Sequence, residues 1–173
     1  METAIRRARA TDVRVIRRLV DMYAGPGPGR LLAKPTVTLF EDVQEFWVAE
    51  DHKTGDVVGC GALHIMWEDL AEVRTVAVDP ACRGHGVGHR IVARLLETAR
   101  ELGVQRVFCL TFEVTFFARH GFRPLQGSPV APEVYEELLR SYDDGVAEFL
   151  DLDRVKPNTL GNSRMLLHLE GDR

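Results

Sequence analysis

Three glycines stand close together at Gly84, Gly86 and Gly88, directly before the most regular apolar repeat in the chain. A strand-like run that stops at Asp79-Pro80 precedes them, so the order is strand, glycine turn and helix. Free N–H groups and the positive dipole end at a helix start favour an anion, and glycine lets a ligand approach the backbone closely. This segment therefore predicts a phosphate-binding turn.

Three kinds of phosphate turn compete for this segment. A Walker turn requires Gly-Lys-Ser/Thr, which the segment lacks. A dinucleotide fold requires GxGxxG at its opening, whereas these glycines are spaced GxGxG and follow a predicted hairpin. The remaining pattern is Arg-x-x-Gly-x-Gly, which Arg83, Gly86 and Gly88 match. A plain tight turn needs one glycine rather than three, so we favour the binding turn.

Length and composition place the chain among ordinary globular proteins. Its 173 residues are 45% hydrophobic and 28% charged, which suffices for a core without disulfides or metals. The net charge of −4 and the pI near 5.9 give no basic footprint for nucleic acid. We expect a single domain over residues 1–173 and no nucleic-acid partner.

The cysteines and histidines show no metal-binding spacing. Cys60, Cys82 and Cys109 lie far apart without a CxxC pair, so neither a disulfide framework nor a zinc site is predicted. His85 and His89 lack the glutamate of HExxH and are interpreted as exposed polar residues. No apolar run approaches the roughly 20 residues of a membrane span, and the start lacks a signal-peptide core. The sequence predicts a cytoplasmic protein without a metal or a membrane contact.

Two periodicities divide the chain into strands and helices. Runs with strand character, bounded by turn signals, cover residues 4–8, 46–50, 57–66, 72–78, 106–110 and 163–169. Runs with helical apolar spacing cover residues 13–23, 39–44, 87–102 and 115–120, and a further helix starts at Pro132 with Val134, Leu138 and Tyr142 on one side. Residues 25–29 (GPGPG) are expected to break the first helix.

The order of these elements predicts the fold class. A β-meander leads into strand, helix and strand around the glycine turn, followed by further helix and a last strand. We expect an α/β (α+β) domain with a mixed, mostly antiparallel twisted sheet flanked by helices and one parallel crossover.

The segment VAVDPACRGHGVGHRIVARLLETA resembles the central motif of the GNAT superfamily of N-acetyltransferases, and residues 117–122 (FARHGF) resemble its second motif. The likeness covers nearly the whole chain in the right order. It implies a GNAT-type fold and acetyl-CoA as co-substrate. The residues that it assigns to coenzyme A are Val76, Ala77, Val78, Arg83, Gly84, His85, Gly86, Val87, Gly88 and Phe117.

Acetyl transfer to an amine requires a base, because an ammonium group is mostly protonated at neutral pH. The resemblance implies Glu72, on the strand that leads into the glycine turn. The competing interpretation is a strand-end glutamate that pairs with Arg74 or with solvent. A backbone N–H near Val76 is expected to stabilise the oxyanion. Phe117 stands where the family often carries an acidic tyrosine, so no general acid is assigned.

Within the superfamily, the chain is most similar to the acetyltransferase domain of N-acetylglutamate synthases, in a short stand-alone form. Residues 31–34 (LLAK), 58–63 with 71–74 (VGCGAL, AEVR) and 107–121 carry this likeness, and the last run has an aromatic pair in place of tyrosine. A dicarboxylic amino acid requires cationic groups at both ends. The candidate substrate-binding residues are Leu32, Lys34, Arg74, Asn162, Ser163 and Arg164.

The resemblance therefore predicts transfer of an acetyl group from acetyl-CoA to the α-amine of L-glutamate, the first step of arginine biosynthesis. Two alternatives stay open. One is acetylation of another small amine, an antibiotic or a protein N-terminus, and the other is a non-catalytic module that senses acetyl-CoA. Domains of this kind often pair, and the apolar final strand (MLLHL) is a candidate homodimer contact.

Overall fold

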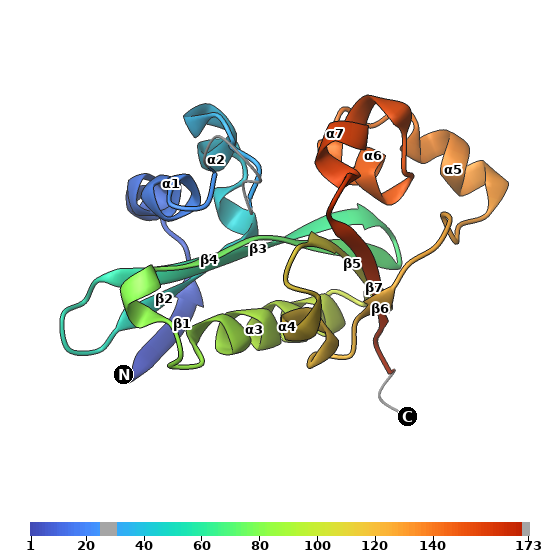
Figure 1. Ribbon diagram of the computed structural model, residues 1–173. Helices are drawn as coiled ribbons and strands as arrows, with labels where there is room; N and C mark the ends of the chain where they lie inside the picture. Colours follow the sequence, from blue (N-terminus) through green and yellow to red (C-terminus); the bar gives the residue numbers. More distant parts are fainter. Residues whose placement is uncertain (25–30, 171–173) are drawn as a thin grey trace. The chain divides into compact units, whose positions relative to one another are not determined.

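The computed structural model describes residues 1–24 and 31–170, which group into two compact units (Figure 1). Unit 1 comprises residues 1–64 and 73–101, without the undescribed part of that range, and unit 2 comprises residues 65–72 with the described residues from 102 onward. The predicted break at residues 25–29 lies outside the described residues. That residues 1–173 form one domain stays a prediction.

The strands follow the hydrogen-bonding order β1-β2-β3-β4-β5-β7-β6. Their bounds are β1 Thr3–Arg7, β2 Phe46–Asp51, β3 Val57–Trp67, β4 Leu70–Val78, β5 Arg106–Thr111, β6 Arg123–Pro124 and β7 Ser163–His168. β1 pairs antiparallel with β2, and β2 with β3. β4 and β5 pair in parallel, with Glu72 opposite Phe108. The mixed sheet flanked by helices and the parallel crossover are therefore confirmed.

In unit 1, helices cover both faces of the strands (Figure 1). The helix α1 (Val13–Asp21) and the helix α2 (Thr36–Glu41) lie on one face, and α3 (Val87–Glu101) lies on the other. The apolar side of α1 packs with Phe46, Val48, Cys60 and Ala62 in one buried cluster. The second predicted helix is displaced: α2 ends at Glu41, and residues 43–45 form a separate 3-10 turn.

α3 lies very close to β3 because glycine occupies the facing positions. A Cβ atom at Gly59 would lie 2.9 Å from Ile91 Cδ1, and a Cβ at Gly61 would lie 2.7 Å from Ile91 Cγ2 and 3.1 Å from Leu95 Cδ1. Side chains alternate across a strand, so Cys60, between these glycines, points to the α1 face. This close approach fixes the start of α3, where the glycine turn ends.

In unit 2, β7 lies between β5 and β6 and pairs antiparallel with both. The final strand is thus flanked on both sides within its own chain, and the homodimer contact stays a prediction. The helices of this unit are α4 (Val114–Ala118), α5 (Pro132–Leu138), α6 (Asp144–Phe149) and α7 (Lys156–Thr159). A buried cluster joins Leu70 and Phe108 of the strands to Val146 and Phe149 of α6.

Some short elements of unit 2 differ from the prediction. Tyr142 lies beyond the end of α5 and is fully exposed, so its placement on that helix was wrong. The sequence analysis also missed β6, α6 and α7, which contain two, six and four residues. Elements this short show less than two full periods, and tertiary packing rather than local pattern stabilises them.

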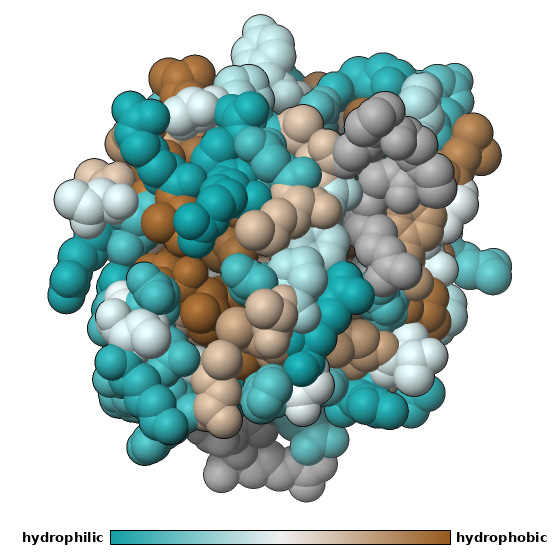
Figure 2. Space-filling view, turned by 60° about the vertical axis from the view of Figure 1, so that its left-hand side comes forward, coloured by the Kyte–Doolittle hydropathy of each residue, from teal (hydrophilic) through white to brown (hydrophobic). Residues whose placement is uncertain are grey.

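The face in Figure 2 intersperses hydrophobic and hydrophilic residues, as expected for a chain with 28% charged residues. Among the described residues, no helix combines the length and hydropathy that crossing a membrane would require.

Candidate active site

The glycine turn begins where β4 ends. Asp79 N donates to Val58 O of β3 at 2.8 Å, and Asp79 Oδ1 accepts from Ala81 N at 2.9 Å. The Asp79 side chain thereby caps a 3-10 turn over Pro80–Cys82, which leads into Arg83. Proline fixes φ and supplies no N–H, so it suits the first position of such a turn. The chain direction into the glycines is set by these local bonds.

Two glycines of the turn adopt the left-handed conformation, with φ of +79° at Gly84 and +72° at Gly86. A Cβ atom at either position would meet no atom within 4 Å, so the space beside the backbone is open. α3 follows directly, with Val87 buried and Gly88 in its first turn. An open backbone cradle at the start of a 15-residue helix fits an anionic phosphate group.

Tyr23 connects this turn to the core of unit 1. Its ring packs against the buried cluster of α1, as expected. Its hydroxyl donates to Val78 O and accepts from Arg83 Nη2 at 3.3 Å. The Arg83 guanidinium also lies 5.5 Å from the Tyr23 ring centroid, within cation–π range. The sequence analysis missed this second role of Tyr23. Its side chain holds the Arg83 guanidinium beside the end of β4.

The strand β4 contains one buried residue with a positive φ, Thr75, at +56°. Such a conformation is strained in a β-branched residue and is common at functional sites. The Cys60 thiol donates to Thr75 O at 3.6 Å. Burial raises the pKa of Cys60 to about 12, so the thiol keeps its proton. Thr75 directly precedes Val76, whose N–H is the predicted oxyanion donor.

The predicted cations of unit 1 have acidic neighbours. Arg74 Nη2 lies 3.9 Å from Glu45 Oε2, and Glu45 Oε1 lies 2.7 Å from His64 Nδ1. Lys34 Nζ lies 3.9 Å from Asp42 Oδ2, while Leu32 is exposed. Substrate binding by Leu32, Lys34 and Arg74 stays a prediction.

Glu72 is buried in unit 2, with 4% exposure. It lies two residues after Leu70 on β4 and therefore shares the face of the strand that packs on α6. A Cβ at Gly145 would collide with Glu72 Oε2 and lie 2.9 Å from its Cδ. The carboxylate thus occupies the space that a side chain at Gly145 would fill. The solvent-exposed interpretation of Glu72 is excluded.

A second buried carboxyl, Glu148, lies on the same short helix and has 3% exposure. Burial, followed by the negative charge of Glu72, raises the pKa of Glu148 to about 8. Asn158 Nδ2 of α7 donates to Glu148 Oε1 at 3.2 Å, and Asn162 Nδ2 donates to Asn158 O at 2.8 Å. A chain of amide groups therefore leads from the final loop to Glu148.

Arg164 holds the far end of α6. Its Nε donates to Glu148 O at 2.9 Å, and its Nη2 donates to Gly127 O at 2.8 Å and to Phe149 O. A cation at the carbonyl end of a helix is favourable. Burial lowers the pKa of Arg164. Ser163 pairs with Thr111 in the sheet. The substrate roles predicted for Asn162, Ser163 and Arg164 stay predictions.

Phe117 belongs to an aromatic row in unit 2. Its ring centroid lies 5.1 Å from Phe116 and 5.3 Å from Phe122, both edge-on. The side chain is 7% exposed. Without a hydroxyl it offers packing rather than a proton, in line with the absence of an assigned acid. Its contact with coenzyme A stays a prediction.

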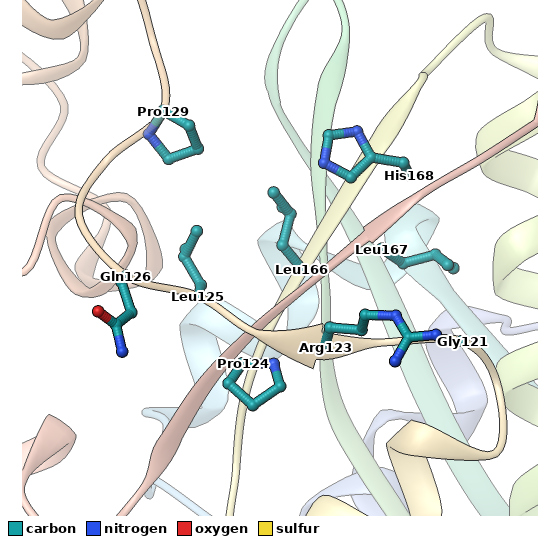
Figure 3. Close-up of a pocket in the computed structure, with 9 residues that line it drawn as sticks. All are labelled: Gly121, Arg123, Pro124, Leu125, Gln126, Pro129, Leu166, Leu167 and His168. Atoms are coloured by element: carbon teal, nitrogen blue, oxygen red, sulfur yellow. The ribbon is translucent and has the colours of Figure 1, made fainter.

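A pocket of about 460 Å³ lies elsewhere in unit 2, between β6 and the end of β7 (Figure 3). Its lining includes Leu125, Leu166 and Leu167, with Arg123, Gln126 and His168 as the larger polar side chains. None of the residues predicted for catalysis or binding lines it. Within the described residues, no group of His, Cys, Asp and Glu is placed to hold a metal.

Gly145 and Glu148 are the site residues that sequence reasoning missed. The run GVAEFL contains one glutamate among apolar residues, and all six of its residues are buried. A lone glutamate inside an apolar run is the signal from which a buried carboxyl could have been predicted. Gly145 gave no such signal. Glycine is required at this position because of the Glu72 carboxylate, and Glu72 is 73 positions earlier in the chain.

Comparison with known proteins places the chain among acetyltransferases. The pattern described as "Acetyltransferase (GNAT) family" matches residues 16–122. An amino-acid acetyltransferase of Mycobacterium tuberculosis is 65% identical over 166 residues, which cover 95% of this chain and 94% of that protein. An amino-acid acetyltransferase of Aeromonas salmonicida is 31% identical over 69% of this chain but only 27% of its own length.

Solved structures show the same fold. A Mycobacterium tuberculosis protein in complex with CoA and NLQ superimposes with a TM-score of 0.92 at 64% identity, covering 96% of this chain and 99% of that one. N-acetylglutamate synthase of Neisseria gonorrhoeae, complexed with coenzyme A and N-acetyl-glutamate, has a TM-score of 0.75 at 23% identity. It covers 98% of this chain, which spans 36% of that larger protein.

Proposed function

Because the chain belongs to the acetyltransferase (GNAT) family, we propose that it transfers the acetyl group of acetyl-CoA to the α-amine of L-glutamate, the first step of arginine biosynthesis. The observation that carries this proposal is the 65% identity to an amino-acid acetyltransferase over nearly the full length of both chains. Glutamate is proposed as the acceptor from the likeness of residues 31–34, 71–74 and 107–121 to N-acetylglutamate synthases.

Coenzyme A is assigned to the end of β4 and to the glycine turn. The open backbone at Gly84 and Gly86 fits the pyrophosphate, and Arg83, held by Tyr23, supplies a cation beside it. The backbone of Val76, Ala77 and Val78 is proposed to pair with the pantetheine arm. His85, Val87 and Gly88 are proposed to complete the cradle, and Phe117 is a further proposed contact of coenzyme A. Acetyl-CoA supplies the activated acyl thioester.

Glu72 is proposed to take the proton from the substrate ammonium. A carboxylate of ordinary acidity is a weak base, but burial and neighbouring charge make its proton affinity adjustable. The missing side chain at Gly145 leaves the space that the Glu72 carboxylate occupies. Lys34, Arg74, Asn162, Ser163 and Arg164 are the proposed polar contacts to the amino acid, with Leu32 as an apolar one.

The test is release of CoA thiol from acetyl-CoA in the presence of a panel of amino acids. We expect turnover with glutamate, and we expect Glu72→Gln to reduce kcat by roughly 10²- to 10⁴-fold, the usual contribution of a general base. Glu68→Gln, which changes an exposed glutamate four positions earlier, serves as the matched control.

The remaining outcomes identify the alternatives. Turnover with another small amine or a peptide N-terminus, but not with glutamate, would show that the acetyl acceptor is an amine other than glutamate. Binding of CoA without turnover on any acceptor would identify a sensing module. Full activity of Glu72→Gln would exclude Glu72 as the base while leaving the reaction itself intact.

A further inference from the structure

Unit 2 buries two carboxyl groups against the same face of α6. Glu72 Oε2 lies where a Cβ of Gly145 would be, and the half-buried Asp143 has its Oδ1 3.0 Å from the same point. Glu148 stands three residues after Gly145 on the helix. Residues three apart on a helix are surface neighbours, with Cβ positions about 5–6 Å apart. Both carboxyl groups are almost fully buried, with 4% and 3% exposure. Glu72 and Glu148 are therefore close neighbours in a medium of low dielectric.

We propose that Glu148 is a positioning residue for Glu72, and that it holds the one proton that the two buried carboxyl groups share at neutral pH. Glu72 then stays ionised and able to accept a proton. This inference rests on the proposed role of Glu72 as the base. Two like charges in a buried site cannot both ionise at ordinary cost, so one carboxyl of such a pair keeps its proton.

The surroundings of Glu148 explain why it is the member that stays protonated. Burial is the largest cause of the raised pKa of Glu148, the negative charge of Glu72 comes next, and Asp144 and Asp143 at the start of the same helix add smaller contributions. Asn158 Nδ2 donates to Glu148 Oε1, which favours the ionised form of Glu148 and offsets part of this rise in its pKa. The cation on this side, Arg164, donates to backbone carbonyls, Glu148 O among them, in the bonds that the structure gives for it.

The proton balance follows from this arrangement. Before the reaction the pair holds one proton, on Glu148. The substrate ammonium gives one proton to a Glu72 oxygen, the N–H bond breaks and an O–H bond forms, and the pair then holds two protons. The neutral amine keeps the electron pair for attack. Solvent takes the proton from Glu72 after product release, and Glu148 keeps its own proton throughout.

The pair can be observed directly by NMR of protein labelled with ¹³C at the glutamate carboxyl carbons, titrated from pH 4 to 10. We expect one carboxyl to titrate near pH 8 and to disappear from that range in Glu148→Gln. In Glu72→Gln we expect the same resonance to titrate at lower pH, because the neighbouring charge is gone. A Glu148 that titrates near 4.5, or one whose midpoint does not move in Glu72→Gln, would overturn the proposal.

A kinetic readout separates this role from simple packing. Glutamine imitates the neutral state of Glu148, so the readout is the ratio of kcat/KM for glutamate in wild type to that in Glu148→Gln, followed from pH 6 to 9. Above pH 8 the wild-type value should fall at least about threefold relative to the variant, because a second buried negative charge repels an anionic substrate. A constant ratio from pH 6 to 9 contradicts the proposal while leaving the reaction intact. If no amino acid is turned over, the proposed function fails. The NMR titration then still shows whether Glu148 keeps its proton at neutral pH beside Glu72.

Discussion

The glycine turn of unit 1 is formed by backbone groups, whereas the carboxyl pair of unit 2 is formed by side chains. The turn is made of backbone: residues 79–88 shape it through local hydrogen bonds and two left-handed glycines. The pair is made of side chains that come from β4 and α6, supported by α7 and β7. A site formed by the backbone depends on the backbone conformation of single residues. A site formed by side chains depends on how segments far apart in the sequence pack and on the space that they leave for those side chains.

This difference predicts how each region responds to mutation. A substitution in the turn changes affinity for a ligand and leaves the rest of the turn in place. A substitution around the carboxyl pair moves the reacting group itself. We therefore expect the larger losses of rate around Glu72 and the smaller, binding-type losses around Gly86.

Among variants that keep Glu72, the largest effect is expected from Gly145→Ala. The added Cβ collides with Glu72 Oε2, so either the carboxylate or α6 must move, and a displacement of about 1 Å costs roughly 10²-fold in rate. The measurement is kcat/KM for glutamate. Ala147→Gly is the control, since it weakens the same helix by about 1 kcal/mol without adding an atom near Glu72. Equal losses in both variants would mean that helix stability, rather than the position of Glu72, limits activity.

The second effect concerns stability against pH. The pKa of Glu148 is raised to about 8 in the folded chain from its ordinary 4.5. Between these values the unfolded chain gives up a proton that the folded chain keeps, so the contribution of Glu148 to stability falls as pH rises through this window and is constant above it. The steepest slope is about 1.4 kcal/mol per pH unit.

Denaturant unfolding of wild type and Glu148→Gln from pH 4 to 9 measures this contribution. The difference in unfolding free energy between the two proteins should change across the window and level off at both ends. A difference that does not vary with pH would show that Glu148 titrates normally in the folded chain.

The third effect is expected in the turn. Gly86→Ala places a Cβ at φ of +72°, which costs about 1–2 kcal/mol of backbone strain, and the methyl group enters the proposed phosphate cradle. We expect the KM for acetyl-CoA to rise about tenfold, the equivalent of about 1.4 kcal/mol, with kcat little changed.

Gly103→Ala is a matched control for the turn. Gly103 has φ of +78° and equally open surroundings, but it follows α3 instead of preceding it. We expect the same loss of stability as in Gly86→Ala and an unchanged KM for acetyl-CoA. A shared increase in KM would remove the support for a phosphate cradle at Gly86.

The smallest effect is expected from Tyr23→Phe. The variant loses the hydroxyl that donates to Val78 O and accepts from Arg83, at a cost of about 1 kcal/mol in unfolding free energy. Thermal unfolding measures it, and the fully exposed Tyr142 provides the control as Tyr142→Phe. Indistinguishable variants would mean that water replaces the Tyr23 hydroxyl without loss.

The same contrast explains what the sequence could predict. β4, the glycine turn and α3 are contiguous, and their patterns are long enough to be recognised, so a glycine turn between a strand and a helix could be predicted from spacing alone. The phosphate ligand of that turn stays a prediction. Glu72 was assigned by likeness, but its partner Glu148 belongs to a six-residue helix that the sequence analysis missed. Arg164 was chosen for its charge, and only the folded chain shows that it donates to the carbonyls of α6. Contacts between distant segments are decided by packing, which no local pattern contains.

The two glycines of β3 also bear on how the chain finds its strand pairing. Gly59 and Gly61 leave no room for a side chain under α3, while the alternate residues Cys60 and Ala62 fill the core under α1. A slip of one residue in β3 would exchange the two sets. It would drive a thiol and a methyl group into Ile91 and open cavities beneath α1. The glycines thus act during folding as a check on register, because they penalise the neighbouring misfolded alignment as well as permit the native one.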